Sequence, residues 1–105
     1  MAIVRGTTPT IIFTFKTIDV SDIDTAYLVI KQWDTAKITK DITSATVDSV
    51  AKTVSWTLTQ TESLSLDPQK KAEVMMDWLM DDGIRGRSVA HCESLENPGK
   101  NEVIS

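Results

Sequence analysis

The pair His91-Cys92 is the first place in this sequence where residue types suggest chemistry, because an imidazole beside a thiol can activate a nucleophile or bind a metal ion. Adjacent residues of a strand, however, point to opposite faces, so these two side chains would not meet. The chain also has no second cysteine or histidine from which to complete a zinc site. We therefore interpret Cys92 as a small buried residue and His91 as a surface residue.

Three aspartates, Asp77, Asp81 and Asp82, lie close together in sequence and would suit a hard cation. They lack the ordered ligand spacing of a calcium-binding loop, however. A turn at Asp81-Asp82-Gly83 explains two of them more simply, because glycine accepts the positive φ that a tight turn needs. The sequence also lacks the Gly-x-Ser-x-Gly motif of serine hydrolases. It therefore predicts no catalytic residue, no metal site and no cofactor, and we expect the protein not to be an enzyme.

Aromatic residues and methionines are the better candidates for binding. Tyr27 and Trp33 share one face of a predicted strand and would form an exposed platform of the kind that binds sugars or protein partners. The alternative is that they cover a second sheet face or a loop. Met75 and Leu79 would leave an apolar strip on the outer face of another strand, which suggests a subunit contact. The candidate interface residues are thus Met75, Leu79, Tyr27 and Trp33.

Residues 70–95 must position several of these candidates, and the first part of this stretch is compatible with two structures. An aspartate–proline pair resembles a helix start, and apolar residues then recur at helical spacing over residues 70–81. Alternation with a period of two fits as well, and the β-rich character of the rest of the chain favours it. We predict a hairpin with a strand at 72–80, a turn at 81–83 and a return run at 84–94. The side chains expected on one face of the first strand are Ala72, Val74, Met76, Trp78 and Met80.

The chain before this hairpin is predicted to be β-structure as well. Residues 10–16 and 52–59 alternate apolar and polar side chains, as half-buried antiparallel strands do. Residues 25–33 are apolar on both faces, which is typical of a central strand covered on two sides. The weaker elements are an edge strand carrying lysines at 36–42, a short strand within 43–49 and a helical turn at 61–64. The expected core residues include Val54, Trp56, Leu58 and Trp78.

Length and charge limit the classes of function. With 105 residues the chain suits a single domain, and its net charge of −4 gives no support for nucleic-acid binding. No apolar run approaches the roughly 20 residues of a membrane helix, and the beginning of the chain lacks the apolar segment of a signal peptide. The single cysteine excludes an intrachain disulfide and fits synthesis in a reducing cytoplasm. We expect neither nucleic acid nor membrane among the partners.

The number and spacing of the predicted strands indicate an all-β fold. We expect an antiparallel two-sheet β-sandwich of immunoglobulin-like size, with about seven strands and at most one short helical turn. It would form one domain over residues 1–105, with a short N-terminal arm at 1–9 and a C-terminal tail at 96–105. The cysteine pair that marks true immunoglobulin domains is absent.

Several segments, in order along nearly the whole chain, resemble a family of small proteins encoded among the tail and baseplate genes of phages and prophages of Gram-positive bacteria. They are RGTTPTIIFTF, TAYLVIKQ, LTQTESLSL, AEVMMDWLMDDGIRGRS and the ending NEVIS. Each is a pattern of residue types, and none is a catalytic signature. The chain is also similar to the N-terminal β-domains of baseplate proteins.

This resemblance implies a virion or virion-assembly protein with a β-sandwich fold and no enzymatic activity. It also favours strand over helix for residues 72–80. We accordingly expect a structural component of a phage tail or baseplate, synthesised in the bacterial cytoplasm and located in the virion. Such a protein would bind other tail proteins and form a homo-oligomer. The alternative is a carbohydrate-binding module that binds cell-wall polysaccharide through Tyr27 and Trp33.

Overall fold

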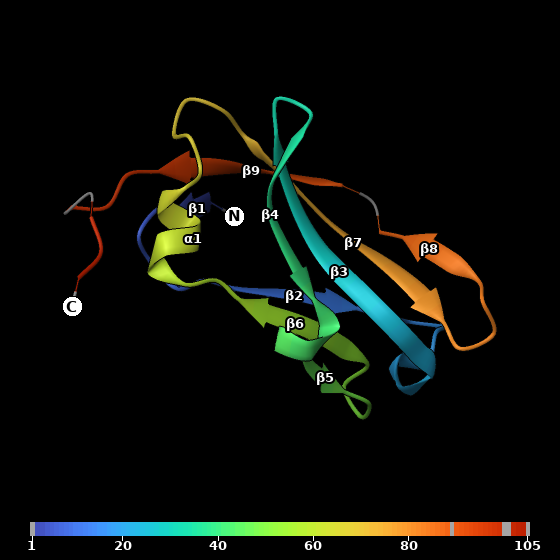
Figure 1. Ribbon diagram of the computed structural model, residues 1–105. Helices are drawn as coiled ribbons and strands as arrows, with labels where there is room; N and C mark the ends of the chain where they lie inside the picture. Colours follow the sequence, from blue (N-terminus) through green and yellow to red (C-terminus); the bar gives the residue numbers. More distant parts are fainter. Residues whose placement is uncertain (1, 89, 100–101, 105) are drawn as a thin grey trace.

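A computed structural model describes residues 2–88, 90–99 and 102–104 of the chain. This part of the chain contains nine strands, arranged in two sheets, with one short α-helix and two 3-10 helices (Figure 1). The arrangement confirms the predicted all-β fold. The larger sheet has the order β1 (Ala2–Val4), β9 (His91–Glu96), β7 (Ala72–Met80), β3 (Ile23–Gln32) and β4 (Thr35–Asp41), with β8 (Arg85–Arg87) also paired to β7. The smaller sheet has the order β2 (Thr10–Thr14), β6 (Thr53–Thr57) and β5 (Thr46–Asp48). The helices are η1 (Val20–Asp22), η2 (Ile42–Ser44) and α1 (Gln60–Leu64).

The N-terminal arm, predicted to lie outside the sheets, adds a parallel strand to the larger one. Its residues 2–4 form β1, which pairs in parallel with β9, so the larger sheet is mixed and not antiparallel as expected. Ile3 is only 1% exposed and belongs to the core. The guanidinium of Arg5 donates to the carbonyl oxygens of Leu64, at 2.8 Å, and Leu66, at 2.7 Å. The arm is therefore part of the fold, and it escaped prediction because three residues are too few for an alternation pattern.

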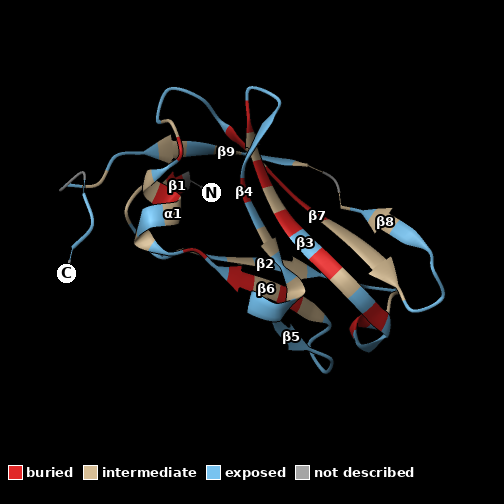
Figure 2. Ribbon diagram, viewed as in Figure 1, coloured by how far each residue is buried: buried red, intermediate tan, exposed pale blue. Residues whose placement is uncertain are grey.

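The two sheets share one hydrophobic core (Figure 2). Val54 and Trp56 of β6 are at most 1% exposed, as the alternation of that strand predicts. Leu28 of β3 is buried as well, but Tyr27 on the other face is 44% exposed, so the expected covering of this strand on two sides is wrong. Trp78 of β7 is half-buried against this core, and its ring meets that of Phe15 edge-to-face with 5.2 Å between centroids. This contact joins the larger sheet to the end of β2. The predicted core positions on β6 are confirmed.

Residues 72–80 form a strand, as predicted, although their composition favours helix locally. β7 pairs antiparallel with β3 along one edge and with β8 and β9 along the other. Pairing on both edges, with burial of Val74 and Met76, outweighs helix propensities that differ by up to roughly 0.7 kcal/mol per residue. The predicted turn also forms, and Gly83, at φ 87°, donates its N–H to the carbonyl of Met80 at 2.9 Å. The return run is divided into β8 and β9.

A buried glutamine at the end of β3 shapes the loop that precedes β7. The side chain of Gln32 is fully buried and pairs with backbone as a neighbouring strand would. Its oxygen accepts from the N–H of Asp67 at 2.8 Å, and its nitrogen donates to the carbonyls of Asp67, at 2.8 Å, and Lys70, at 2.9 Å. These bonds satisfy loop backbone that no strand pairs. They also hold Asp67 in an irregular segment at the point where the alternative helix would have begun.

Candidate functional site

The predicted apolar strip of Met75 and Leu79 does not form. Met75 is only 5% exposed and Leu79 is half-buried, although both lie on the outer face of β7 as expected. The reason is that β7 is a central strand, so that side chains on neighbouring strands, such as Val29 opposite Met75, cover its outer face from the side. The prediction of an exposed contact at Met75 is therefore wrong.

Tyr27 and Trp33 are both exposed, at 44% and 52%, but they do not form one platform. Tyr27 lies in the middle of β3 on the outer face of the sheet. Trp33 lies beyond the end of β3 in the tight turn to β4, with φ 51°. Six residues of extended chain separate them by roughly 20 Å. Near Trp33 the structure places the ammonium of Lys37, 6.0 Å from the ring centroid.

His91 and Cys92 lie on opposite faces of β9, as predicted. His91 pairs with Val74 and faces the core side of the sheet, whereas Cys92 pairs with Glu73 on the outer face. Cys92 is exposed, so the prediction that it is buried is wrong. The reason is that its neighbour on that face, Glu73, is a charged residue that provides no apolar cover.

The aspartates near the hairpin also separate in the structure. Asp77 lies on the outer face of β7 with its Oδ2 atom 3.4 Å from a guanidinium nitrogen of Arg85. Asp82 lies in the turn, where its carboxylate accepts the N–H of Ile84 at 3.0 Å. Among the described residues, no three His, Cys, Asp or Glu side chains are grouped so that they could hold a metal ion.

A groove of about 610 Å³ opens between β2 and the larger sheet. Its polar groups include His91 and Glu93 of β9. The three strands of the smaller sheet leave this part of the six-stranded larger sheet uncovered. Its apolar walls are formed by Ile11, Phe13 and Phe15 on one side and Val74 and Trp78 of β7 on the other.

The backbone of β2 has an open edge beside this groove. In the described part of the chain β2 pairs only with β6. The carbonyl of Pro9 accepts the N–H of Leu58 at 2.9 Å, and at the other end the N–H of Phe15 donates to the carbonyl of Lys52 at 2.9 Å. Odd-numbered residues thus direct their backbone groups to β6, and even-numbered ones direct theirs to the open edge. The outward-directed residues are Thr10, Ile12 and Thr14.

This edge lacks the features that usually protect an edge strand. The segment Thr10–Thr14 contains no charged residue, no proline and no register shift, and Ile12 at its centre is 61% exposed. β4, at one edge of the larger sheet, is different: it carries Lys37 and Lys40, and its pairing with β3 has a register shift. An unprotected edge beside an apolar groove is suited to accepting a strand from another chain.

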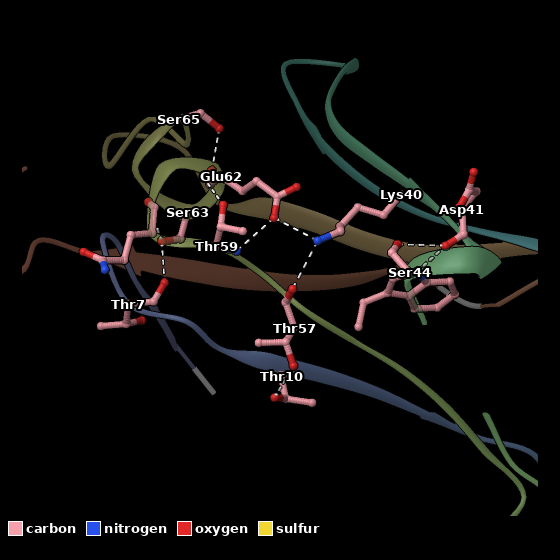
Figure 3. A network of polar contacts seen from close by, with 12 residues as sticks. Thr7, Thr10, Lys40, Asp41, Ser44, Thr57, Thr59, Glu62, Ser63 and Ser65 are labelled. Atoms are coloured by element: carbon pink, nitrogen blue, oxygen red, sulfur yellow. Dashed lines mark hydrogen bonds and ion pairs between the residues drawn. The ribbon is translucent and has the colours of Figure 1, made fainter. Parts of the chain in front are cut away.

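A cluster of polar side chains around α1 has a structural role (Figure 3). Thr59 and Glu62 form a reciprocal capping box, and the carboxylate of Glu62 also accepts from the ammonium of Lys40 at 2.9 Å. Lys40 donates in addition to the carbonyl of Thr57 at 3.1 Å. Partial burial opposes the charge on Glu62, but the bonds from Thr59 and Lys40 outweigh it and lower the pKa of the carboxyl. The cluster ties α1 to β4 and β6.

Comparison with protein-family models and with curated protein sequences finds no match for this chain. Within the described residues, no helix has the length and apolar character needed to cross a membrane.

Sequence reasoning missed the open edge of β2, which is the most distinctive of these surfaces. The alternation of residues 10–16 identified the strand and its two faces. The alternation carries no information about which strands lie beside β2, because pairing with β6 joins residues far apart in sequence, such as Thr10 and Thr57. The absence of charge between Pro9 and Lys16 is the one local signal that could have marked this edge.

Proposed function

We propose that this chain is a non-enzymatic structural or assembly component of a phage or prophage tail or baseplate, acting through protein–protein contacts. The observation that carries the proposal is the open edge of β2 beside an apolar groove. The resemblance of its sequence segments supplies the phage context. The protein is located in the virion, and its partners are other tail or baseplate proteins.

The proposed contact is the addition of a strand. An extended segment of a partner pairs with the outward backbone groups of Thr10, Ile12 and Thr14, and alternate side chains of that segment enter the groove. The backbone bonds supply affinity, while the shape of the apolar walls selects the partner. If the added segment comes from another copy of this chain, the two contact surfaces differ. Such a head-to-tail contact repeats into a ring or a filament, which is the form of homo-oligomer expected in a tail.

We assign the two sheets to a β-sandwich of immunoglobulin-like size, in which the mixed larger sheet has one parallel pair at its edge. Its support is the single core to which both sheets contribute buried residues.

Deletion of the gene tests this function. Electron microscopy of lysates after induction should reveal heads with missing or incomplete tails, and a wild-type copy supplied in trans should restore them. A matched copy carrying Val50→Lys, in a turn where Val50 is 93% exposed and far in sequence from β2, should restore tails as well. Normal infectious particles from the deletion strain would contradict the proposal.

Carbohydrate binding is the second candidate function. The separation of Tyr27 and Trp33 removes the support for a shared platform. Tyr27, however, borders a pocket of its own on the outer face of the larger sheet. That pocket favours the binding of a single sugar ring beside Tyr27.

A further inference from the structure

A second concave surface lies on the outer face of the larger sheet, across β4, β3, β7 and β8. It is a pocket of about 320 Å³, a size at the lower end of small-ligand sites. Val29 and Leu79 contribute apolar surface, and the half-exposed ring of Tyr27 lies beside them. Apolar and aromatic surface of this kind packs well against the C–H face of a sugar ring.

The polar side of this pocket is an incompletely bonded ion pair. Oδ2 of Asp77 is 3.4 Å from a guanidinium nitrogen of Arg85, which is long for a charged hydrogen bond. Oδ1 of Asp77 is buried and accepts no hydrogen bond from any described residue. The Arg85 side chain is 76% exposed, so packing does not hold it in place. A buried acceptor without a donor is costly, and a ligand hydroxyl that shifts the exposed Arg85 side chain and donates to Oδ1 would relieve that cost.

The two charges also restrict the kind of ligand. Asp77 repels an anion and Arg85 repels a cation, whereas a neutral polyol can satisfy both. One hydroxyl donates to the carboxylate while its neighbour accepts from the guanidinium. The hydroxyls of Thr25 and Thr39 lie at the pocket wall and can do either.

We propose that this pocket binds one ring of a neutral saccharide, stacked on Tyr27 and held through adjacent hydroxyls by Asp77 and Arg85. Trp33 takes no part, because it lies in the turn beyond the end of β3. Pocket and groove lie on opposite faces of β7 and share one lining residue, Trp78, so this site does not use the open edge of β2. Asp77 and Leu79 face the pocket, and Val74 faces the groove.

The test is a titration of the ¹⁵N-labelled full chain, followed by NMR, with glucose, galactose, N-acetylglucosamine and linear tetramers of each. We expect amide shifts centred on Thr25, Tyr27, Leu79 and Arg85 for at least one probe. Asp77→Asn keeps the side-chain shape and removes the charge, and should weaken binding by about ten-fold or more. Tyr27→Ala should also lose binding, and the dispersion of each variant's spectrum reports that it is folded.

Trp33→Ala is the matched control, because it removes the other exposed aromatic residue and lies outside the pocket. It should bind like the wild type. Four results would overturn the proposal: no shift with any probe up to roughly 10 mM, unchanged binding by Asp77→Asn, unchanged binding by Tyr27→Ala, or loss of binding in Trp33→Ala.

Discussion

Gly86 and Trp78 form a pair in which one residue leaves room for the other. They are directly opposite in the β7–β8 hairpin, and a Cβ atom at position 86 would lie 2.5 Å from two ring atoms of Trp78. No real Cβ contact is that short, so any side chain at 86 would displace the indole. The indole in turn contacts Phe15 and closes one side of the core. Gly86 therefore serves the core through the space that it leaves.

Gly86→Ala should destabilise the protein by about 1–3 kcal/mol, the usual cost of overpacking. Urea denaturation followed by Trp fluorescence measures the change in the free energy of unfolding. Gly99→Ala is the control, because a Cβ atom there meets nothing within 4 Å. Equal stability of both variants would contradict the proposed fit of Trp78 against β8.

Glu62 gives the stability a specific dependence on pH. Its pKa in the folded state is lowered from an ordinary value of 4.5, because bonds from Thr59 and Lys40 outweigh the effect of partial burial. A lowered folded pKa means that the unfolded chain binds the proton more tightly. The contribution of Glu62 is thus fully present above about pH 4.5 and is lost as the pH falls through the folded pKa.

Glu62→Gln should keep the cap, since glutamine also completes a capping box, but lose the charge. We expect it to be less stable than the wild type by roughly 1 kcal/mol at pH 7. The difference should shrink as the pH falls below 4.5 and vanish once the carboxyl of Glu62 is protonated in the folded state. Thermal denaturation of the wild type and of the variant between pH 3 and 7 measures this difference in stability. A difference that stays constant over this range would show that the charge does not act as described.

At the scale of elements, the sequence is informative where the pattern is local. Alternation with a period of two is enough to identify β2 and β6 and the faces that they direct to the core. It does not identify the buried face of β3, whose residues are apolar on both faces. β7 was predicted against its local propensity, and the deciding factor, pairing on both of its edges, became visible only in the structure.

What sequence reasoning missed depends on contacts between distant residues. β1 is too short for a pattern and is held by the bonds of Arg5 to carbonyls some sixty residues away. The burial of Met75 and the exposure of Cys92 follow from which strands lie beside β7 and β9, and no local pattern contains that information. The pocket at Asp77 likewise requires the register of β3, β7 and β8.

The open edge of β2 makes opposite predictions for two adjacent residues. The N–H of Ile12 points away from β6, so Ile12→Pro removes a donor that the fold does not use and should cost no more than about 1 kcal/mol. The N–H of Ile11 points to β6, so Ile11→Pro should cost about 3 kcal/mol or more. Thermal denaturation of the two purified variants measures this contrast.

The folded Ile12→Pro variant should fail to join particles when it replaces the wild-type chain, because a strand can no longer add to β2. Immunoblots of particles from a strain that carries the variant and from the wild-type strain measure its incorporation. Incorporation at the wild-type level would mean that the partner binds elsewhere.

The whole molecule is an elongated body with principal extents of 44 × 29 × 20 Å and two sheets of unequal size. The smaller sheet leaves a groove on one face of the larger sheet, and the pocket at Tyr27 lies on the other face. The proposed protein strand and the proposed saccharide would therefore contact opposite faces of the larger sheet, with Trp78 as the lining residue common to both. Such an arrangement suits a component that is fixed in an assembly on one side and accessible on the other.

We propose that this chain belongs to a phage tail or baseplate. Quantitative mass spectrometry of purified particles and of isolated tail intermediates, prepared after induction of the resident phage, tests this proposal. We predict that the chain is present in a constant ratio to the tail proteins, in finished particles if it is structural or in the intermediates alone if it is an assembly factor. Its absence from both preparations, while the tail proteins are detected, would contradict the claim.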